Sequence, residues 1–382
     1  MRIIQEWLRD FNTTDNDEVL AFAADKDGNV YVTGYSEAVM VSAAQVDQME
    51  IGEAVSSLLK RGIPPVRNSD ELGGVANGKR GTSNIWLMKY AASGALEWKK
   101  ELSLGVDGLW LRLEVDNDGD VILASRSDDQ APSLAKYGSR GNKRWSIEMD
   151  PAPNVLADIA TDSEKNIYVA ANKGADDAIA YFVAQYDSNG KMLNLIENAG
   201  AVDVISIDSE DNIVVSGEAP WGVFVGKMAP TLNGDIEEVW RRQLDAGHGE
   251  KVTAIDTDDS SSIYVTGVID DENLSPEVEE TRDVWLAKYS RDGQRQWYKR
   301  TTQSVAEDVS AALVVDDGGY VYVAGHTTGE LVPGGTVGER DIWIAKYMPD
   351  GSELWRYQHG ITDDDYCYGL ALDAKGNIYI AG

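Results

Sequence analysis

The sequence predicts an all-β fold, and three observations support this prediction. Seven short runs of β-branched and aromatic residues recur along the 382-residue chain, and each run ends in a small residue. An aspartate stands at a fixed step before the end of each run, nine residues in six copies and eleven in the fifth. Turn residues separate the short apolar runs. A repeat this regular determines the architecture before any single motif is considered.

Each copy of the repeat is located in the sequence by its run and its aspartate. The runs are Asn29–Gly34, Asp120–Ser125, Asn166–Ala171, Asn212–Gly217, Ser262–Gly267, Tyr320–Gly325 and Asn377–Gly382. The aspartates that precede them are Asp25, Asp116, Asp162, Asp208, Asp256, Asp316 and Asp373.

Each repeat contains four predicted strands. An apolar run such as Ala312–Val315 leads into the aspartate, and a tight turn such as Asp25–Asn29 leads into the second strand. Gly and Asn in that turn supply the positive-φ positions of a hairpin. The third strand is rich in Trp, as in Ile342–Tyr347, and the fourth is centred on a Trp such as Trp355. Four antiparallel strands repeated seven times predict a seven-bladed β-propeller of four-stranded antiparallel blades.

The two ends of the chain predict how the ring closes. Gln5–Phe11, which contains Trp7, resembles a fourth strand without the first three. Gly369–Asp373 and Ile378–Gly382 provide a first and a second strand. We therefore predict a closing blade that is shared between the N- and C-termini and lacks its third strand. A chain that continues beyond this sequence is the favoured source of that strand, and a foreign strand or an empty slot are the alternatives.

Residues 35–84 are predicted to be an insertion between strands two and three of the first full blade. The insertion is almost long enough for an eighth blade, but it has neither the Trp-x-x-Lys-Tyr nor the Asp-x-x-Gly-Asn pattern. Ser42–Arg61 instead has apolar residues at near-helical spacing and is followed by Gly62 and a pair of prolines. We expect one domain over residues 1–382, with a short helix in this insertion.

The carboxyl-terminal end of the chain carries the clearest resemblance to a known family. Ile342–Tyr347, Asp350-Gly351, Trp355, Asp364–Tyr366 and the strand that ends at Gly382 resemble the bacterial SBBP β-propeller repeat. The likeness covers nearly the whole chain except residues 35–84. It is weakest in blades two to four, where Tyr181–Tyr186 has no Trp and Gly108, Asn154 and Gly200 replace the equivalent of Asp365. The resemblance implies a secreted or surface-exposed bacterial protein, and it implies no defined chemistry.

The composition limits the classes of partner that the chain is expected to bind. The formal net charge is −31 and the isoelectric point is about 4.3, so the chain repels nucleic acid and anionic lipid. Cations, basic proteins and neutral sugars remain compatible, and solubility alone also explains the charge. No apolar run reaches transmembrane length, and the segment Met1–Gln5 is too short for a signal peptide, so an export signal is not expected in this chain. The single cysteine, Cys367, is expected to be a buried, inert thiol.

The order of strands separates two faces of the ring. Turns between strands one and two, and between strands three and four, share one face and are short. The other connections lie on the opposite face, which also receives the insertions 35–84, Val268–Asp283 and His326–Asp341. Variable loops on a rigid scaffold often carry recognition, so we predict binding on this insertion-bearing face.

Eight residues on that face are candidate ligand-binding residues, although local packing or capping explains each one by itself. Trp110 and Trp221 fall outside the regular Trp positions, and either could stack on a sugar or anchor a protein. The histidines are His248, His326 and His359; they have no metal-ligand spacing, although the last two flank one blade. Asp17, Asp308 and Asp365 stand eight residues before a turn aspartate, and His248 takes the same register; this predicts an acidic ring at the mouth of the central channel.

No motif in the sequence defines a catalytic or metal site. Asp116–Asp120 is similar to the start of a calcium loop, but Ser127 occupies the place of the bidentate glutamate, so a hairpin turn is the better explanation. No nucleophile elbow, zinc-protease motif or phosphate loop is present. We predict a non-enzymatic extracellular binding or assembly module for a protein or glycan, without a cofactor. The alternatives are a lectin-like propeller, a glycoside hydrolase or lyase with carboxylates in the channel, and a structural subunit completed by a foreign strand.

Overall fold

The computed structural model describes residues 17–36, 84–102, 104, 109–128, 130–174, 180–231, 234–244, 250–270, 282–302, 306–335, 338–360 and 364–382. Every regular element within these ranges is a β-strand. The described part of the chain has no helix that could cross a membrane. The helix predicted in the insertion, and the strand predicted at Gln5–Phe11, lie outside the described residues.

Six sheets have four antiparallel strands each, and every sheet is formed by consecutive strands. The first three blades are β1 (Asp17–Ala24), β2 (Val30–Ser36), β3 (Asn84–Tyr90), β4 (Leu96–Leu102); β5 (Trp110–Val115), β6 (Val121–Arg126), β7 (Ser133–Tyr137), β8 (Lys143–Glu148); and β9 (Val155–Thr161), β10 (Ile167–Lys173), β11 (Ala180–Tyr186), β12 (Met192–Ala199). The next three are β13 (Ala201–Ile207), β14 (Ile213–Ala219), β15 (Gly222–Pro230), β16 (Ile236–Gln243); β17 (Glu250–Thr257), β18 (Ile263–Asp270), β19 (Arg282–Tyr289), β20 (Arg295–Arg300); and β21 (Asp308–Val315), β22 (Val321–Thr327), β23 (Asp341–Tyr347), β24 (Glu353–His359).

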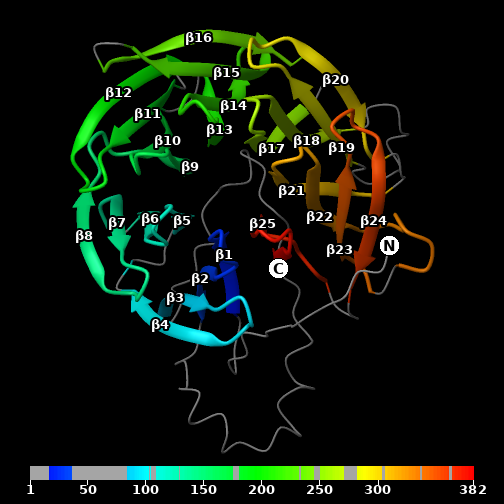
Figure 1. Ribbon diagram of the computed structural model, residues 1–382, viewed down its shortest axis with the longest axis horizontal. Coiled ribbons are helices and arrows are strands. Elements are labelled where there is room, and N and C mark those ends of the chain that lie inside the picture. The colour runs from blue at the N-terminus through cyan, green and yellow to red at the C-terminus, as the bar shows by residue number, and fades with distance from the viewer. Residues whose placement is uncertain are drawn as a thin grey trace, which may run out of the picture.

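A seventh, smaller sheet completes the ring. It pairs β25 (Gly369–Leu372) with β26 (Ile378–Ala381). The first strand of each blade contacts the first strand of the next around the axis, and β25 contacts both β21 and β1 (Figure 1). The predicted all-β propeller of four-stranded antiparallel blades is confirmed. The predicted number of blades is wrong, because the described residues form six four-stranded blades and the seventh copy of the repeat contributes only two strands.

The hydrophobic core lies between the blades. Third-strand tryptophans Trp86, Trp285 and Trp343 are completely buried, as the packing interpretation of their positions predicted. One cluster joins Tyr264 of the fifth blade with Leu313 and Trp343 of the sixth. Because each blade is covered on both faces, its second and third strands are apolar on both sides.

The turn aspartates hold the hairpins between first and second strands. Asp116 Oδ1 accepts the backbone N–H groups of Asp118 and Asp120 at 2.9 and 3.0 Å, which supports a turn role for this segment. In the fifth blade this role belongs to Asp258, whose Oδ1 accepts from Ser260 and Ser262 at 3.0 and 2.8 Å. The sequence-based choice of Asp256 was therefore wrong. Counted from Asp258, the fifth copy has the same nine-residue spacing as the others.

A β-bulge explains why most runs end in glycine. The pairing of β17 with β18 shifts between Val252 and Ala254, next to Gly267. A Cβ atom on Gly267 would lie 1.8 Å from the carbonyl oxygen of Lys251, far inside contact distance. In the second blade, where Ser125 takes this place, β5 pairs with β6 without a shift in register.

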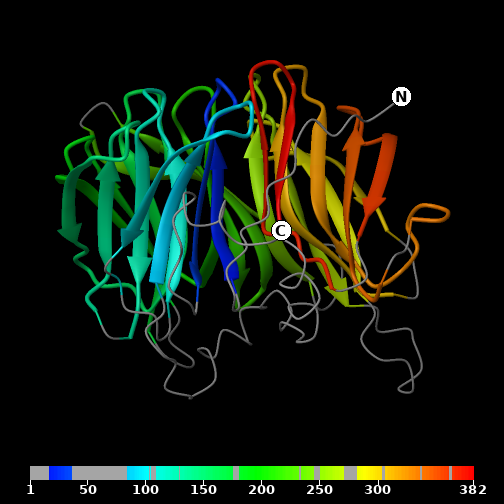
Figure 2. The same cartoon turned by 90° about the horizontal axis from the view of Figure 1, so that it is seen from below.

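The strands run between two faces of the ring (Figure 2). We call the end with the turns between the first and second strands and between the third and fourth strands of each blade the turn face. The opposite end, which receives the connections between the second and third strands of each blade and the connections between blades, is the loop face.

Candidate functional site

A tryptophan contact recurs at four interfaces between consecutive blades. The indole N–H of the fourth-strand Trp donates to the carbonyl of the residue two positions after the third-strand Tyr of the next blade. The four pairs are Trp98 with Ser139 at 3.0 Å, Trp145 with Ser188 at 3.1 Å, Trp240 with Arg291 at 3.1 Å, and Trp297 with Pro349 at 3.0 Å. A glycine in the same turn packs on the ring; a Cβ on Gly293 would lie 2.7 Å from Trp240. This contact closes these four interfaces at the turn face.

Trp355 is the corresponding residue of the sixth blade, and its buried Nε1 has no hydrogen-bond partner among the described residues. Its ring is held in the usual position. The Trp355 and Tyr322 ring centroids are 6.3 Å apart at 70°, compared with 6.2 Å and 61° for Trp297 and Tyr264. The acceptor is missing because the next sheet, β25–β26, has no third strand in the described part of the chain.

Apolar side chains beside Trp355 are exposed to solvent. Tyr357 lies two residues further along β24, on the same side of the strand as Trp355, and is 43% exposed. Ile380 is opposite Leu370, which packs against the sixth blade, and is 39% exposed. Residues opposite each other in a pair share a face of the sheet, so Ile380 also faces the sixth blade. We call the β26 edge together with Trp355, Tyr357 and Ile380 the open seat.

The turn aspartate next to the open seat differs from its counterparts in one contact. In other blades a third-strand lysine reaches this carboxylate: Lys136 Nζ is 2.7 Å from Asp116 Oδ2, and Lys227 Nζ is 2.6 Å from Asp208 Oδ2. In the two-stranded sheet, Asp373 Oδ2 accepts from the Tyr379 hydroxyl at 3.2 Å. None of the ion pairs among the described residues includes Asp373.

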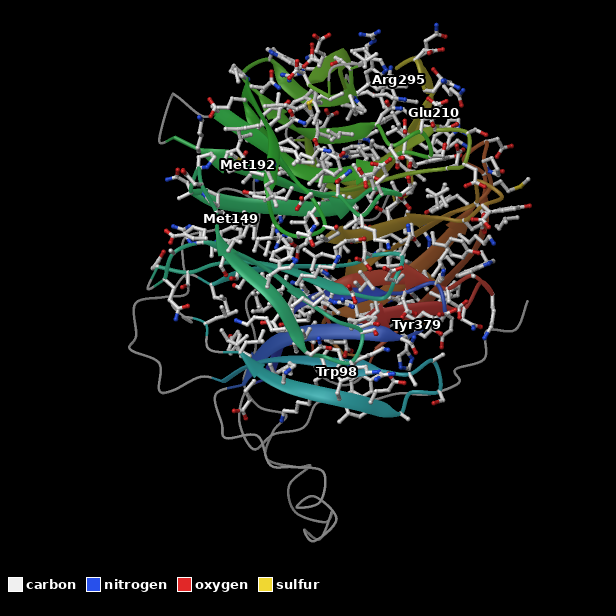
Figure 3. All side chains as sticks on the ribbon, turned by 60° about the vertical axis from the view of Figure 1, so that its left-hand side comes forward. Trp98, Met149, Met192, Glu210, Arg295 and Tyr379 are labelled. Carbon is white, nitrogen blue, oxygen red and sulfur yellow. The ribbon has the colours of Figure 1, made fainter. Side chains whose placement is uncertain are left out.

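Tyr379 fixes the position of that carboxylate. The residue packs with the core of the first blade and is labelled on the two-stranded sheet in Figure 3. The hydroxyl of Tyr322 accepts from Lys346 and donates to Asp316 Oδ2 at 3.2 Å, the same distance as between Tyr379 and Asp373. The open seat therefore presents the same oxygen pair that binds a lysine in the sixth blade.

Charged side chains form a second candidate site around the axis of the ring. Asp158 on β9 accepts the backbone N–H of Ile205 at 3.1 Å, and Arg112 on β5 donates to the carbonyl of Ala157. Each side chain thus pairs with the free backbone edge of the first strand in the next blade. The pattern was missed in the sequence, where its only signal is a polar residue inside an apolar first strand.

Burial raises the pKa values of the axial carboxyl groups. The pKa of Glu114 is raised to about 8, first by burial and then by the charges of Asp158 and Asp256. Burial also raises the pKa of Asp256 to about 6, against the effect of its hydrogen bonds from Val315 and Thr257. Burial therefore favours the protonated form of Glu114.

The turn face has a pocket of about 600 Å³ where the first two blades meet the two-stranded sheet. Its lining includes Asp25, Asp27, Asp118, Lys26, Lys89 and Leu372. Recognition had been predicted on the loop face, so this pocket was not expected. Most of its charged lining belongs to the stereotyped hairpin turns, and Lys89 lies on β3.

The two candidate tryptophans of the loop face lie in different blades. Trp110 begins β5 and is half-buried against the core between the second and third blades. Trp221 lies between β14 and β15 and is 45% exposed, with its ring tilted against Phe224 at a centroid distance of 6.0 Å. Trp110 therefore packs, whereas Trp221 presents an aromatic ring to solvent.

Of the three histidines, His326 is placed differently from the prediction. It lies inside β22, completely buried, and neither ring nitrogen has a hydrogen-bond partner among the described residues. Burial and then the charge of Arg340 lower the pKa of His326 to about 3. His359 is exposed at the end of β24, and Ile342 stands between the two in the ladder. His248 lies outside the described residues.

The predicted acidic ring is not formed as expected. Asp308 is completely buried and accepts the Thr327 hydroxyl at 2.5 Å, so it does not line an open channel mouth. Asp365 is half-buried, and its backbone N–H donates to the Arg340 carbonyl at 2.9 Å. Asp17 begins β1, and its side chain is not among those described. Across the described ranges, no group of three or more His, Cys, Asp or Glu side chains could hold a metal ion.

A ring of four-stranded antiparallel blades defines the chain as a β-propeller. Residues 354–382 match the SBBP β-propeller repeat, which confirms the resemblance inferred from the sequence. The chain is therefore a propeller that carries an SBBP-type repeat at its carboxyl end. None of the curated proteins is similar in sequence at a significant level.

Several solved structures have a similar fold. A protein from Lactobacillus plantarum is 15% identical, with a TM-score of 0.50, and the match covers 76% of this chain and 82% of that one. A gluconolactonase from Xanthomonas campestris is 11% identical, with a TM-score of 0.40 over 64% of this chain and 79% of that one. A putative gluconolactonase is 11% identical, with a TM-score of 0.39 over 63% and 80%. Of these matches, only the one to the Lactobacillus plantarum protein, with its TM-score of 0.50, shows a shared fold, and it says nothing about activity.

Proposed function

We propose that this propeller is a non-enzymatic assembly module of a bacterial extracellular protein, and that it binds a partner protein through the open seat. The observation that carries this proposal is the buried indole N–H of Trp355, which has no acceptor among the described residues although its four counterparts are all paired. An unsatisfied buried donor costs about 1–3 kcal/mol, so a partner that supplies the acceptor regains this energy.

A polypeptide strand fits the open seat better than a sugar does. The β26 edge offers a row of backbone groups, and Tyr357 and Ile380 offer apolar surface beside it. Strand addition uses both, because main-chain hydrogen bonds supply affinity and side-chain pockets supply specificity. The net charge of −31 favours a basic segment and speeds its association.

The proposal includes the closing blade predicted from the sequence. Residues 5–11 would supply its fourth strand, and the partner strand would lie between them and β26. Trp7 supports this arrangement, because the fourth strands of most other blades also contain a Trp. Partner recognition by the loop face stays a prediction, since the larger insertions there fall mostly outside the described residues.

A display selection tests the function without knowledge of the partner. Random twelve-residue peptides are selected on the immobilised protein, and each enriched clone is compared on the Ile380→Asp and Leu195→Asp variants. Both residues are 39% exposed, but Leu195 lies on β12 of the third blade, which is not adjacent to the open seat. Clones that lose binding only to Ile380→Asp support the function. Enrichment limited to clones that bind both variants equally would contradict it.

A second candidate function is cleavage of glycosides at the axis, as a hydrolase or a lyase. It is favoured by Glu114, whose pKa of about 8 would keep a general acid protonated at neutral pH beside the carboxylates of Asp158 and Asp256. The test is a screen of polysaccharides for cleavage, with Glu114→Gln as the comparison. Cleavage that persists in Glu114→Gln would remove this candidate.

A further inference from the structure

We infer that the strand accepted by the open seat carries the third-strand pattern of this chain, Trp-x-Ala-Lys-Tyr, in one definite register on β26. This inference rests on the proposed function and deepens it by naming the chemistry of the partner. The inference concerns a strand of a partner protein; the strands of the six complete blades are paired within their own sheets and do not supply it.

The register follows from the complete blades. In the sixth blade Tyr322 is opposite Lys346, and Val321 is opposite Tyr347. The fifth blade has the same arrangement in its second and third strands. Ile378 and Tyr379 occupy the corresponding positions of β26. The incoming lysine is therefore placed opposite Tyr379, and the tyrosine that follows it opposite Ile378.

The lysine gives the strand its first specific contact. The sixth blade binds Lys346 through the Tyr322 hydroxyl and through Asp316, whose Oδ2 is 3.5 Å from Nζ. Tyr379 and Asp373 present the same pair of oxygens at the open seat. A lysine there would join a preformed acceptor pair and would also offset one negative charge of an acidic protein.

The backbone that follows the tyrosine gives the second contact. In all four interfaces that have this contact, the acceptor of the indole N–H is the carbonyl two residues after the third-strand Tyr. The same residue of the incoming strand would meet Trp355 Nε1. Glycine four residues after the tyrosine would allow the chain to pass over the indole, as Gly293 passes over Trp240.

A synthetic peptide with the sequence of Arg282–Gln294 tests the inference, because it contains the whole pattern from Trp285 to Gly293. Binding to the full chain is measured by calorimetry, and backbone protection of Ile378–Ala381 by hydrogen exchange. We expect a dissociation constant of about 10 µM and slower exchange in β26, as for an added strand. The same peptide with Lys288→Glu places a negative charge beside Asp373 and should bind at least about tenfold more weakly.

Matched protein variants localise the contact. Trp355→Phe removes the donor at the open seat and should weaken binding about fivefold, whereas Trp145→Phe removes a donor that is already paired with Ser188 and should leave affinity unchanged. Equal affinity for wild type, Trp355→Phe and Ile380→Asp would overturn the inference.

Two further outcomes separate the inference from the function. If the peptide fails to bind while the display selection yields other sequences that depend on Ile380, the inferred pattern is wrong and the function stands. If β26 of the free protein already exchanges as slowly as β22, the edge is occupied within the chain and both are overturned.

Discussion

Asp256 Oδ2 accepts the backbone N–H of Val315 at 2.8 Å, so a side chain of the fifth blade pairs with the free edge of the first strand of the sixth. Asp158 makes the same kind of bond to Ile205 between the third and fourth blades. The inner strands of a propeller have one edge without a neighbouring strand, and these carboxylates accept hydrogen bonds from some of the backbone N–H groups along that edge. The axial acids therefore stabilise the ring, in addition to being candidates for acid catalysis.

Replacing Asp256 by alanine should destabilise the protein by about 1–3 kcal/mol, because the N–H of Val315 loses its acceptor. Asp256→Asn keeps an acceptor oxygen and should lose clearly less. Urea unfolding followed by circular dichroism measures both variants. Equal stability of wild type and Asp256→Ala would show that water replaces the carboxylate.

Stability should fall as the pH rises from about 4.5 to about 8. The pKa of Glu114 is raised to about 8 and that of Asp203 to about 7, both chiefly by burial, so the folded state keeps protons that the unfolded state releases in this window. Glu114→Gln should remove much of this loss, on the order of 2–4 kcal/mol at pH 8.5. Melting temperatures of both proteins from pH 4.5 to 8.5 provide the measurement. A flat profile for the wild type would contradict the assignment.

The two tryptophan positions should differ in the free protein. Trp145→Phe loses a hydrogen bond to Ser188 and should cost about 1 kcal/mol more than Trp355→Phe, whose donor has no partner among the described residues. Thermal unfolding of the two variants measures this difference directly. An equal cost would mean that Trp355 already has an acceptor.

Gly267→Ala should destabilise the fifth blade by about 3 kcal/mol or more, because the new methyl group meets the carbonyl oxygen of Lys251 at 1.8 Å. Gly226→Ala is the matched control in a neighbouring blade, since its Cβ would have contacts of 3.6 Å and longer. Denaturant unfolding compares the two. A tolerated Gly267→Ala would show that the bulge can relax.

A glycan array tests the lectin-like alternative. Trp221 presents a ring that is 45% exposed on the loop face, whereas Trp110 packs against the core. If the alternative holds, Trp221→Ala should abolish the array signal and Trp110→Phe should keep it. Absence of any signal with the wild type would leave protein binding as the remaining mode of recognition.

The repeat pattern predicted most of the fold because every blade repeats the same turn and the same buried strands. It failed in the fifth copy, where Asp256 and Asp258 both precede a run and the turn has neither glycine nor asparagine. Ser261 takes the positive φ of 56° there, so the turn survives without its usual signal. The blade count failed in the closing sector, where the described residues form only two strands and the fourth strand predicted at Gln5–Phe11 lies outside them.

The candidate sites were less predictable because they depend on neighbours from other blades. His326 was expected in a loop after Gly325, but β22 continues to Thr327 and buries it. The importance of Trp355 could not be read from its own repeat, where it resembles the other fourth-strand tryptophans. Trp355 differs because the sheet that follows has no third strand among the described residues to accept its indole N–H.

Among the described residues, the ring is closed at one place by a sheet of only two strands, which makes this sector the least stable. Local opening of β25–β26 would break the contacts of β25 with β1 and β21 without unfolding a complete blade. A ligand bound to this sector would therefore stabilise the whole ring, and its binding would slow the unfolding of blades that it does not contact.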